Sequence, residues 1–136
     1  MMMRYNIEGG DFSAAGRASS EVKKTLKQFN ISPIILRRIA VALYEAEMNV
    51  VAHAWNGIMN VDIQPQRISV VIEDEGPGIE DLNKAMEEGF STASDEVRQM
   101  GFGAGMGLPN IKRNSDKMFL SSTLGVGTRL EITVNF

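Results

Sequence analysis

The N-terminal part of the chain shows a strand pattern and then a helical pattern. Tyr5 and Ile7 alternate with polar residues, which predicts a strand over residues 3–8. After a Gly-Gly break, apolar residues recur at helical spacing, and Asp11 or Ser13 is a suitable N-cap. This helix is expected to end near residue 29 with the following side chains buried: Ala14, Ala15, Val22, Leu26 and Phe29.

A second, longer helix is predicted from Pro33 to about Trp55. Ser32 is a favourable N-cap, and proline suits the first helical position because the N–H that it lacks would be unpaired there. Asn56 and Gly57 are expected to end this helix. The side chains predicted to face inward are Ile35, Ile39, Leu43, Ala46 and Val50.

Two pairs of strands follow the long helix. Residues 60–64 and 68–73 flank a turn at Pro65, and residues 117–122 and 128–136 flank a glycine-rich turn. Strands joined by such short turns are antiparallel.

The segment between the two strand pairs has a weaker pattern. Residues 80–88 predict a short helix, and residues 108–114 predict another. Residues 90–100 are polar and poorly periodic, which predicts a mobile segment just before a run of glycines.

This order of elements predicts an α/β fold, a two-layer sandwich in which helices cover one face of a mixed, mainly antiparallel sheet. The regular alternation of strand and helix that builds a doubly wound dinucleotide fold is missing. The 136 residues suffice for one domain over residues 1–136.

Composition narrows the function. The net charge of -3 argues against sequence-independent binding to nucleic acid, and no apolar run is long enough for a membrane helix. The chain has no cysteine, so a disulfide framework is excluded, and a reducing cytoplasm is expected.

Three clusters carry candidate chemistry. In the first, Glu45, Asn49 and His53 share one stripe of the long helix. An Asn oxygen can bind Mg²⁺, and a carboxylate one turn away can accept a proton. The alternative for these residues is a polar helix face that meets solvent.

The second cluster is Asp74 with Gly76 and Gly78, at the end of a β-rich run. The carboxylate can accept a hydrogen bond from an amino group such as adenine N6, and the glycines let a flat base approach the backbone. The alternative is a turn with an acidic edge.

The third cluster is the run GFGAGMGLPN, residues 101–110. It fits neither a P-loop, because no Gly-Lys occurs in the chain, nor the spacing of a dinucleotide-binding fingerprint. A flexible linker and a phosphate-binding loop before a helix both remain open. Together, the three clusters supply the parts of an ATP site.

The segments EAEMNVVAH, EDEGPGI and GFGAGMGLPNIKR resemble the N box and the two glycine boxes of the GHKL ATPase superfamily, which includes gyrase, histidine kinases and MutL. The resemblance covers nearly the whole chain and implies the Bergerat fold. The run EDEGPGIEDLNKAMEEGFSTAS is most similar to the anti-sigma-factor serine/threonine kinases.

This resemblance implies roles for individual residues. Glu45 matches the proposed general base, Asn49 the magnesium ligand and Asp74 the adenine-reading acid, while residues 90–100 match the ATP lid. The remaining residues expected to contact the nucleotide are Gly76, Gly78, Ile79, Gly101, Gly103, Gly105, Met106, Gly107, Leu108 and Thr128.

The resemblance also implies a function. We expect an ATP- and Mg²⁺-dependent kinase that phosphorylates a Ser or Thr of a STAS-domain sigma-factor antagonist, with a sigma factor as a further partner and a homodimer as a common assembly. The alternatives are a nucleotide-gated binding module and an ATPase without a protein acceptor. Phosphorylation on histidine is not expected, because His53 is the single histidine and lies within the N box.

Overall fold

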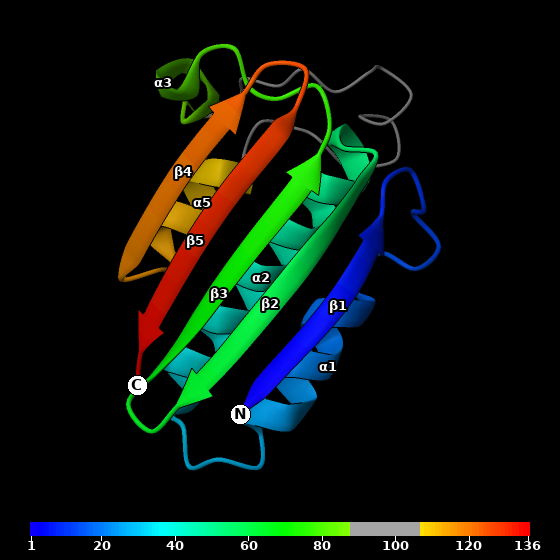
Figure 1. The fold of residues 1–136 in the computed structure, drawn as a ribbon. Coiled ribbons are helices and arrows are strands. Elements are labelled where there is room, and N and C mark those ends of the chain that lie inside the picture. The colour runs from blue at the N-terminus through cyan, green and yellow to red at the C-terminus, as the bar shows by residue number, and fades with distance from the viewer. Residues whose placement is uncertain (88–106) are drawn as a thin grey trace.

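The computed structural model describes residues 1–87 and 107–136, which form a five-stranded sheet with helices on one of its faces (Figure 1). The strands are β1 (Met2–Glu8), β2 (Asn56–Gln64), β3 (Arg67–Glu75), β4 (Lys117–Thr123) and β5 (Gly127–Asn135). The helices are α1 (Arg17–Leu26), α2 (Pro33–His53), α3 (Leu82–Ala85) and α5 (Gly107–Arg113).

The sheet order is β1-β2-β3-β5-β4, and each neighbouring pair is antiparallel. The two-layer α/β sandwich is therefore confirmed. The prediction of a mixed sheet differs in one respect, because the described strands include no parallel pair.

The core lies between the sheet and its helices. Along β2 and over most of β3 and β5, every second side chain is buried, as expected for strands with one covered face. Leu43, Val50 and Ile111 meet these side chains from α2 and α5 and are at most 1% exposed. Burial of each such side chain stabilises the fold by roughly 1.5–3 kcal/mol. None of the helices in the described ranges is long and apolar enough to cross a membrane.

Helix α1 begins later than predicted. Its N-cap is Gly16, at a φ of 91°, and neither Asp11 nor Ser13 caps the helix; the Ser13 hydroxyl donates to Asp11 instead. The first N–H groups of the helix donate to Glu47 of α2, and this distant carboxylate replaces the local cap. Of the side chains predicted to be buried, Phe29 is 40% exposed because the helix has ended before it.

Helix α2 begins where predicted. The Ser32 hydroxyl accepts a hydrogen bond from the Ile35 N–H at 3.3 Å, and Pro33 is the first helical residue. The predicted end is wrong, since Asn56 and Gly57 belong to β2. The Trp55 N–H already donates to the Glu75 carbonyl at 2.8 Å, so the chain enters the sheet directly after the helix.

The C-terminal ends of α2 and β3 lie at one end of the sandwich, opposite both chain termini (Figure 1). The turn between β4 and β5 lies at the same end, where the Gly76 N–H donates to the Val126 carbonyl at 3.1 Å. This end brings the first two candidate clusters together, although 25 positions separate Asn49 and Asp74 along the sequence.

Candidate nucleotide site

The first wall of the candidate site is the C-terminal half of α2. Glu45 and Asn49 are half-buried, whereas Ala46 and Val50 beside them are 1% exposed, so the polar stripe is set at an angle to the core. Neither the Glu45 nor the Asn49 side chain has a hydrogen-bond partner among residues 1–87 and 107–136. Within these ranges both side chains are therefore available to a ligand.

Gly107, the last glycine of the run, lies against these two side chains. A methyl group placed on Gly107 would come within 3.1 Å of Asn49 Oδ1 and 3.4 Å of Glu45 Oε2. Helix α5 begins at this glycine and packs on α2, and Leu108, the next residue, packs against the core. The fold thus joins the end of the third cluster to the first.

The rest of the glycine run lies outside the described residues. Gly101, Gly103, Gly105 and Met106 are in this group, as are the predicted lid, residues 90–100, and the predicted helix beyond residue 87. The described part of that helix is α3, for which the Asp81 carboxylate accepts the capping hydrogen bond from the Lys84 N–H.

The second wall is built around Asp74, near the end of β3. Its Oδ1 accepts a hydrogen bond from the Thr128 N–H at 3.0 Å, and no residue of the described ranges bonds to its other carboxylate oxygen. Burial raises the pKa of the Asp74 carboxyl above its ordinary value, and the hydrogen bond from Thr128 acts in the opposite direction. One carboxylate oxygen is thus fixed in place and the other can accept a hydrogen bond.

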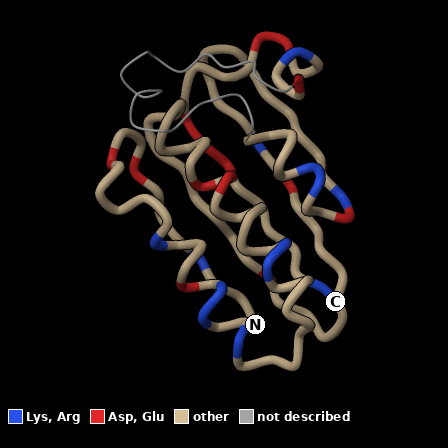
Figure 2. Tube along the Cα trace, turned by 180° about the vertical axis from the view of Figure 1, so that it is seen from behind, with Lys and Arg blue, Asp and Glu red and all other residues tan. Residues whose placement is uncertain are grey.

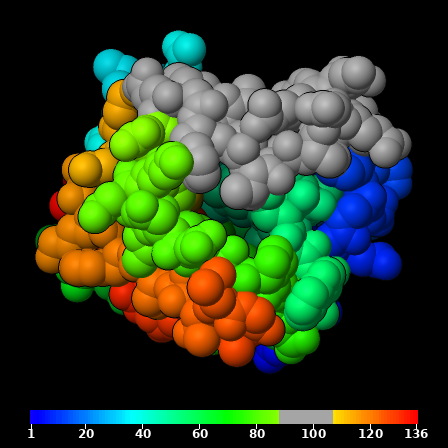
Figure 3. Space-filling view, turned by 90° about the horizontal axis from the view of Figure 1, so that it is seen from above, coloured from blue at the N-terminus to red at the C-terminus, as the bar shows by residue number. Residues whose placement is uncertain are grey.

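Two glycines make room for Asp74. A methyl group on Gly57 would lie 3.3 Å from Asp74 Cβ and 2.9 Å from a methyl of Val50, and one on Gly127 would collide with the Asp74 carbonyl. The backbone of Gly57 therefore lies between Asp74 and Val50 of α2, and there is no side chain at this position to push the two apart. The two walls are neighbours, and the molecule is hollowed between the end of α2 and the segment after β3 (Figure 3).

Ser122 ties the second wall together. Its hydroxyl accepts the Ile79 N–H at 2.7 Å and lies 3.0 Å from the Gly127 carbonyl, which can only accept. Because a serine hydroxyl has one proton, the Thr128 hydroxyl, 2.9 Å away, donates to Ser122. The hairpin β4–β5 thereby holds both Asp74 and the loop after β3.

The loop after β3 is packed on both sides. Gly76 lies against Ala54, the C-cap residue of α2, and Gly78 lies against Thr123 and Leu124 of the β4–β5 hairpin. Gly78 has a φ of 77°, which favours glycine. Backbone packing and the hydrogen bond from Ile79 to Ser122 thus hold this loop between the end of α2 and the β4–β5 hairpin.

Two further residues were not singled out by the sequence patterns. Ser122 shares the inward face of β4 with Leu120, and this alternation is a signal that could have revealed it. Glu47 is 2% exposed, and the apolar residues three or four positions away, Leu43, Val50 and Val51, are buried, so a charged residue within an apolar helix stripe was the corresponding signal. His53 is half-buried, and burial lowers its pKa, which fits a packed neutral residue.

The described residues contain no group of three or more His, Cys, Asp and Glu side chains that could hold a metal ion by itself. A Mg²⁺ ion at Asn49 would therefore take most of its ligands from phosphate oxygens and water. That coordination is the usual one for Mg²⁺ in nucleotide sites. The donor set fits a metal that arrives with a nucleotide.

Comparison with known proteins defines the class of protein. Residues 11–134 match the family described as "Histidine kinase-like ATPase domain". The chain belongs to this family, which agrees with its antiparallel sheet and one-sided helical layer.

Individual relatives narrow the class further. The chain is 32% identical to the serine/threonine-protein kinase RsbT of Bacillus subtilis (strain 168) over 113 residues, which are 80% of this chain and 79% of the relative. It is 36% identical to the anti-sigma F factor of Caldanaerobacter subterraneus subsp. tengcongensis over 100 residues, 70% of this chain and 66% of the relative. The chain thus spans slightly less than two thirds of the anti-sigma F factor.

Proposed function

We propose that this chain is an ATP- and Mg²⁺-dependent protein kinase that phosphorylates a Ser or Thr of a STAS-domain partner. The observation that carries the proposal is the meeting of Gly107 with Glu45 and Asn49, one backbone away from the Asp74 wall. The name of one relative, a serine/threonine-protein kinase, supports the reaction, and the anti-sigma F factors support a partner in sigma-factor regulation. A sigma factor as second partner and a homodimer belong to the same proposal.

The Asp74 wall would recognise the adenine. The open carboxylate oxygen of Asp74 accepts a hydrogen bond from the exocyclic amino group, while Thr128 holds the other oxygen. The loop with Gly76 and Gly78 presents backbone instead of side chains, so a flat ring can approach closely. This wall provides orientation and selectivity for the base.

The wall of α2 would act on the phosphates. Asn49 Oδ1 is the protein ligand for Mg²⁺, which when bound neutralises phosphate charge and aligns the γ-phosphoryl group. Gly107 leaves the space beside Asn49 that a side chain would fill. Leu108 packs on the core and so fixes the start of α5 at this point.

Glu45 would be the general base. Its carboxylate is half-buried, one helical turn from Asn49 and without a competing partner in the described parts of the chain. It accepts the proton of the acceptor hydroxyl as the oxygen of that hydroxyl bonds to the γ-phosphorus, and the bond from phosphorus to the β–γ bridging oxygen breaks. ADP leaves, and the partner carries the phosphate.

The test is incubation with γ-labelled ATP, Mg²⁺ and a STAS-domain protein encoded nearby. Label on the partner is the expected result, and a Ser/Thr→Ala partner should receive none. Nucleotide-dependent co-elution without label would contradict the kinase and indicate a nucleotide-gated binding module. Release of free phosphate that is independent of the partner would indicate an ATPase.

A further inference from the structure

The helical layer has a charge that differs from the charge of the whole chain. The chain carries a net charge of -3, yet α1, α5 and the part of α2 before Glu45 contain only one acidic residue, Glu21. Figure 2 shows Lys and Arg on all three helices, and the acidic residues of α2 lie in the upper half of that helix. The exposed cations of this basic face are Arg17, Lys23, Lys24, Lys27, Arg37, Lys112 and Arg113.

An apolar stripe of α2 runs through the basic face. Ile34 is 75% exposed and Tyr44 is 42% exposed, and Val41, one turn before Tyr44, is half-buried. Over these ten residue steps the stripe is about 15 Å long. The stripe thus places an aliphatic and an aromatic side chain among the cations of the basic face, and an apolar centre with a polar rim is the usual composition of a protein interface.

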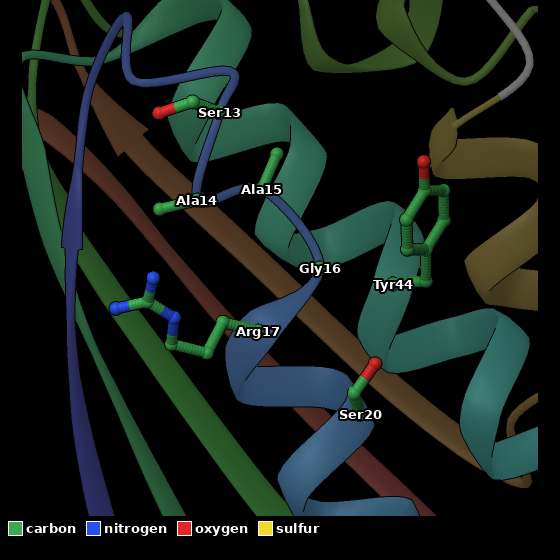
Figure 4. A pocket seen from close by; sticks show the side chains of 7 residues that line it. All are labelled: Ser13, Ala14, Ala15, Gly16, Arg17, Ser20 and Tyr44. Carbon is green, nitrogen blue, oxygen red and sulfur yellow. The ribbon is translucent and has the colours of Figure 1, made fainter.

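The stripe ends beside Glu45, the proposed general base, and beside a surface cavity. Tyr44 precedes Glu45 directly, and its ring lies 3.3 Å from a methyl group placed on Gly16. Tyr44 also forms one side of an open cavity of about 360 Å³, whose other lining includes Ser13, Gly16 and Ser20 (Figure 4). A side chain of a docked protein could be anchored there.

We propose that the basic face and the Ile34–Tyr44 stripe together bind the acceptor protein, and that this acceptor is acidic around its Ser or Thr. The inference rests on the proposed kinase function, because it assumes that the acceptor hydroxyl comes to Glu45. Among the described surfaces, this face alone leads along α2 to Glu45, whereas the open face of the sheet is separated from it by the core. Cations around the rim attract an acidic partner and speed its association, and Tyr44 supplies an aromatic anchor.

Charge reversal tests the electrostatic part. Arg37→Glu and Lys112→Glu should each raise the KM for the STAS-domain acceptor by about tenfold or more at low salt. The KM for ATP and the partner-free hydrolysis rate should stay unchanged. Arg4→Glu, on the open face of the sheet, is the matched control. Equal KM values for the acceptor in Arg37→Glu and Arg4→Glu would overturn the proposal.

Photo-cross-linking tests the location without relying on catalysis. Tyr44→p-benzoylphenylalanine should cross-link to the STAS-domain acceptor, and Phe119→p-benzoylphenylalanine, at a side chain that is 64% exposed on β4, should not. Cross-linking from position 119 alone would overturn the docking surface and leave the kinase function intact. Cross-linking from position 44 without phosphate transfer by the wild type would keep the surface and refute the kinase. Failure of the wild type both to bind and to phosphorylate the acceptor would refute both.

Discussion

The two walls of the candidate site differ in how their polar groups are held. At the Asp74 wall, one chain of hydrogen bonds joins the carboxylate, Thr128, Ser122 and the Ile79 N–H. At the α2 wall, neither the Glu45 nor the Asn49 side chain has a partner in the parts of the chain that the structure describes. The first wall is held rigidly, as its proposed contact with adenine requires, and the side chains of the second wall are unpaired in these ranges, as their proposed contacts with phosphate and Mg²⁺ require.

The same contrast appears within one turn of α2. Glu47 is buried and accepts three backbone N–H groups, from Gly16, Ala18 and Ser19, at 2.9–3.3 Å. The carboxylate of Glu45, two residues earlier, faces the site and accepts none from the described residues. Position on the helix thus separates a carboxylate that holds the fold from one that is available for chemistry.

The largest predicted effect is on the open wall. Glu45→Ala should lower the rate of phosphate transfer by about 10²–10⁴-fold, since loss of a general base typically costs that much. Affinity for ATP should be retained, because Glu45 is not expected to contact the nucleotide base. The measurement is single-turnover transfer from γ-labelled ATP, with Glu73→Ala on the exposed sheet face as control. A wild-type rate of transfer in Glu45→Ala would refute the assignment of Glu45 as the general base.

Glu47→Ala should instead lower stability. It leaves three N–H groups at the start of α1 without their acceptor, and each unsatisfied buried group costs about 1–3 kcal/mol, so a loss of at least about 3 kcal/mol in the free energy of unfolding is expected. Urea denaturation measures it. Glu45→Ala should shift the same free energy by less than about 0.5 kcal/mol. Equal losses of unfolding free energy in the two variants would contradict the assignment of a structural role to Glu47 and not to Glu45.

Asp74→Asn breaks the preorganised wall. The Asn oxygen can still accept the Thr128 N–H, but its amino group then faces the amino group of adenine, and two donors cannot pair. An unpaired buried group costs roughly 1–3 kcal/mol, so ATP affinity should fall by up to about a hundredfold. Calorimetric titration with ATP checks this, and an unchanged Kd would refute the adenine role.

The pH dependence of binding follows from the raised pKa of Asp74. A raised pKa means that this carboxyl takes up its proton at a higher pH than an exposed aspartate does. ATP affinity should therefore weaken as pH falls through that raised pKa and be fully present above it. The Asp74→Asn variant has no carboxyl to titrate at this position, so its pH profile shows the effect of protonating the phosphates alone. Identical pH profiles would show that Asp74 does not titrate against the nucleotide.

Local patterns predicted most of the fold, and the differences have long-range causes. Ser32 caps α2 because its partner is three residues away, which a sequence pattern can show. The cap of α1 could not be predicted in this way, because Glu47 lies 28 to 31 residues from the N–H groups that it accepts. Likewise, spacing placed Glu45 and Asn49 on one stripe, but only the packing of α5 brings Gly107 to them.

The Asp74 wall shows the same limit. The pattern D-x-G-x-G located the loop, whereas the glycines that make room for the carboxylate, Gly57 and Gly127, come from the two neighbouring strands. The roles of Gly101, Gly103, Gly105 and Met106 remain predictions, because these residues lie outside the described parts of the chain.

The smallest predicted effect sharpens the comparison between the walls. Ser122→Ala removes the hydroxyl that joins Ile79 and Thr128, and a hydrogen bond of this kind contributes about 0.5–1.5 kcal/mol. ATP affinity should fall by about fivefold while kcat for phosphate transfer is unchanged, because only the base-binding wall is loosened. Ser121→Ala, the exposed neighbour on β4, is the control. A fall in kcat at unchanged affinity would mean that Ser122 acts on the phosphate side, and the division of labour between the two walls would then be wrong.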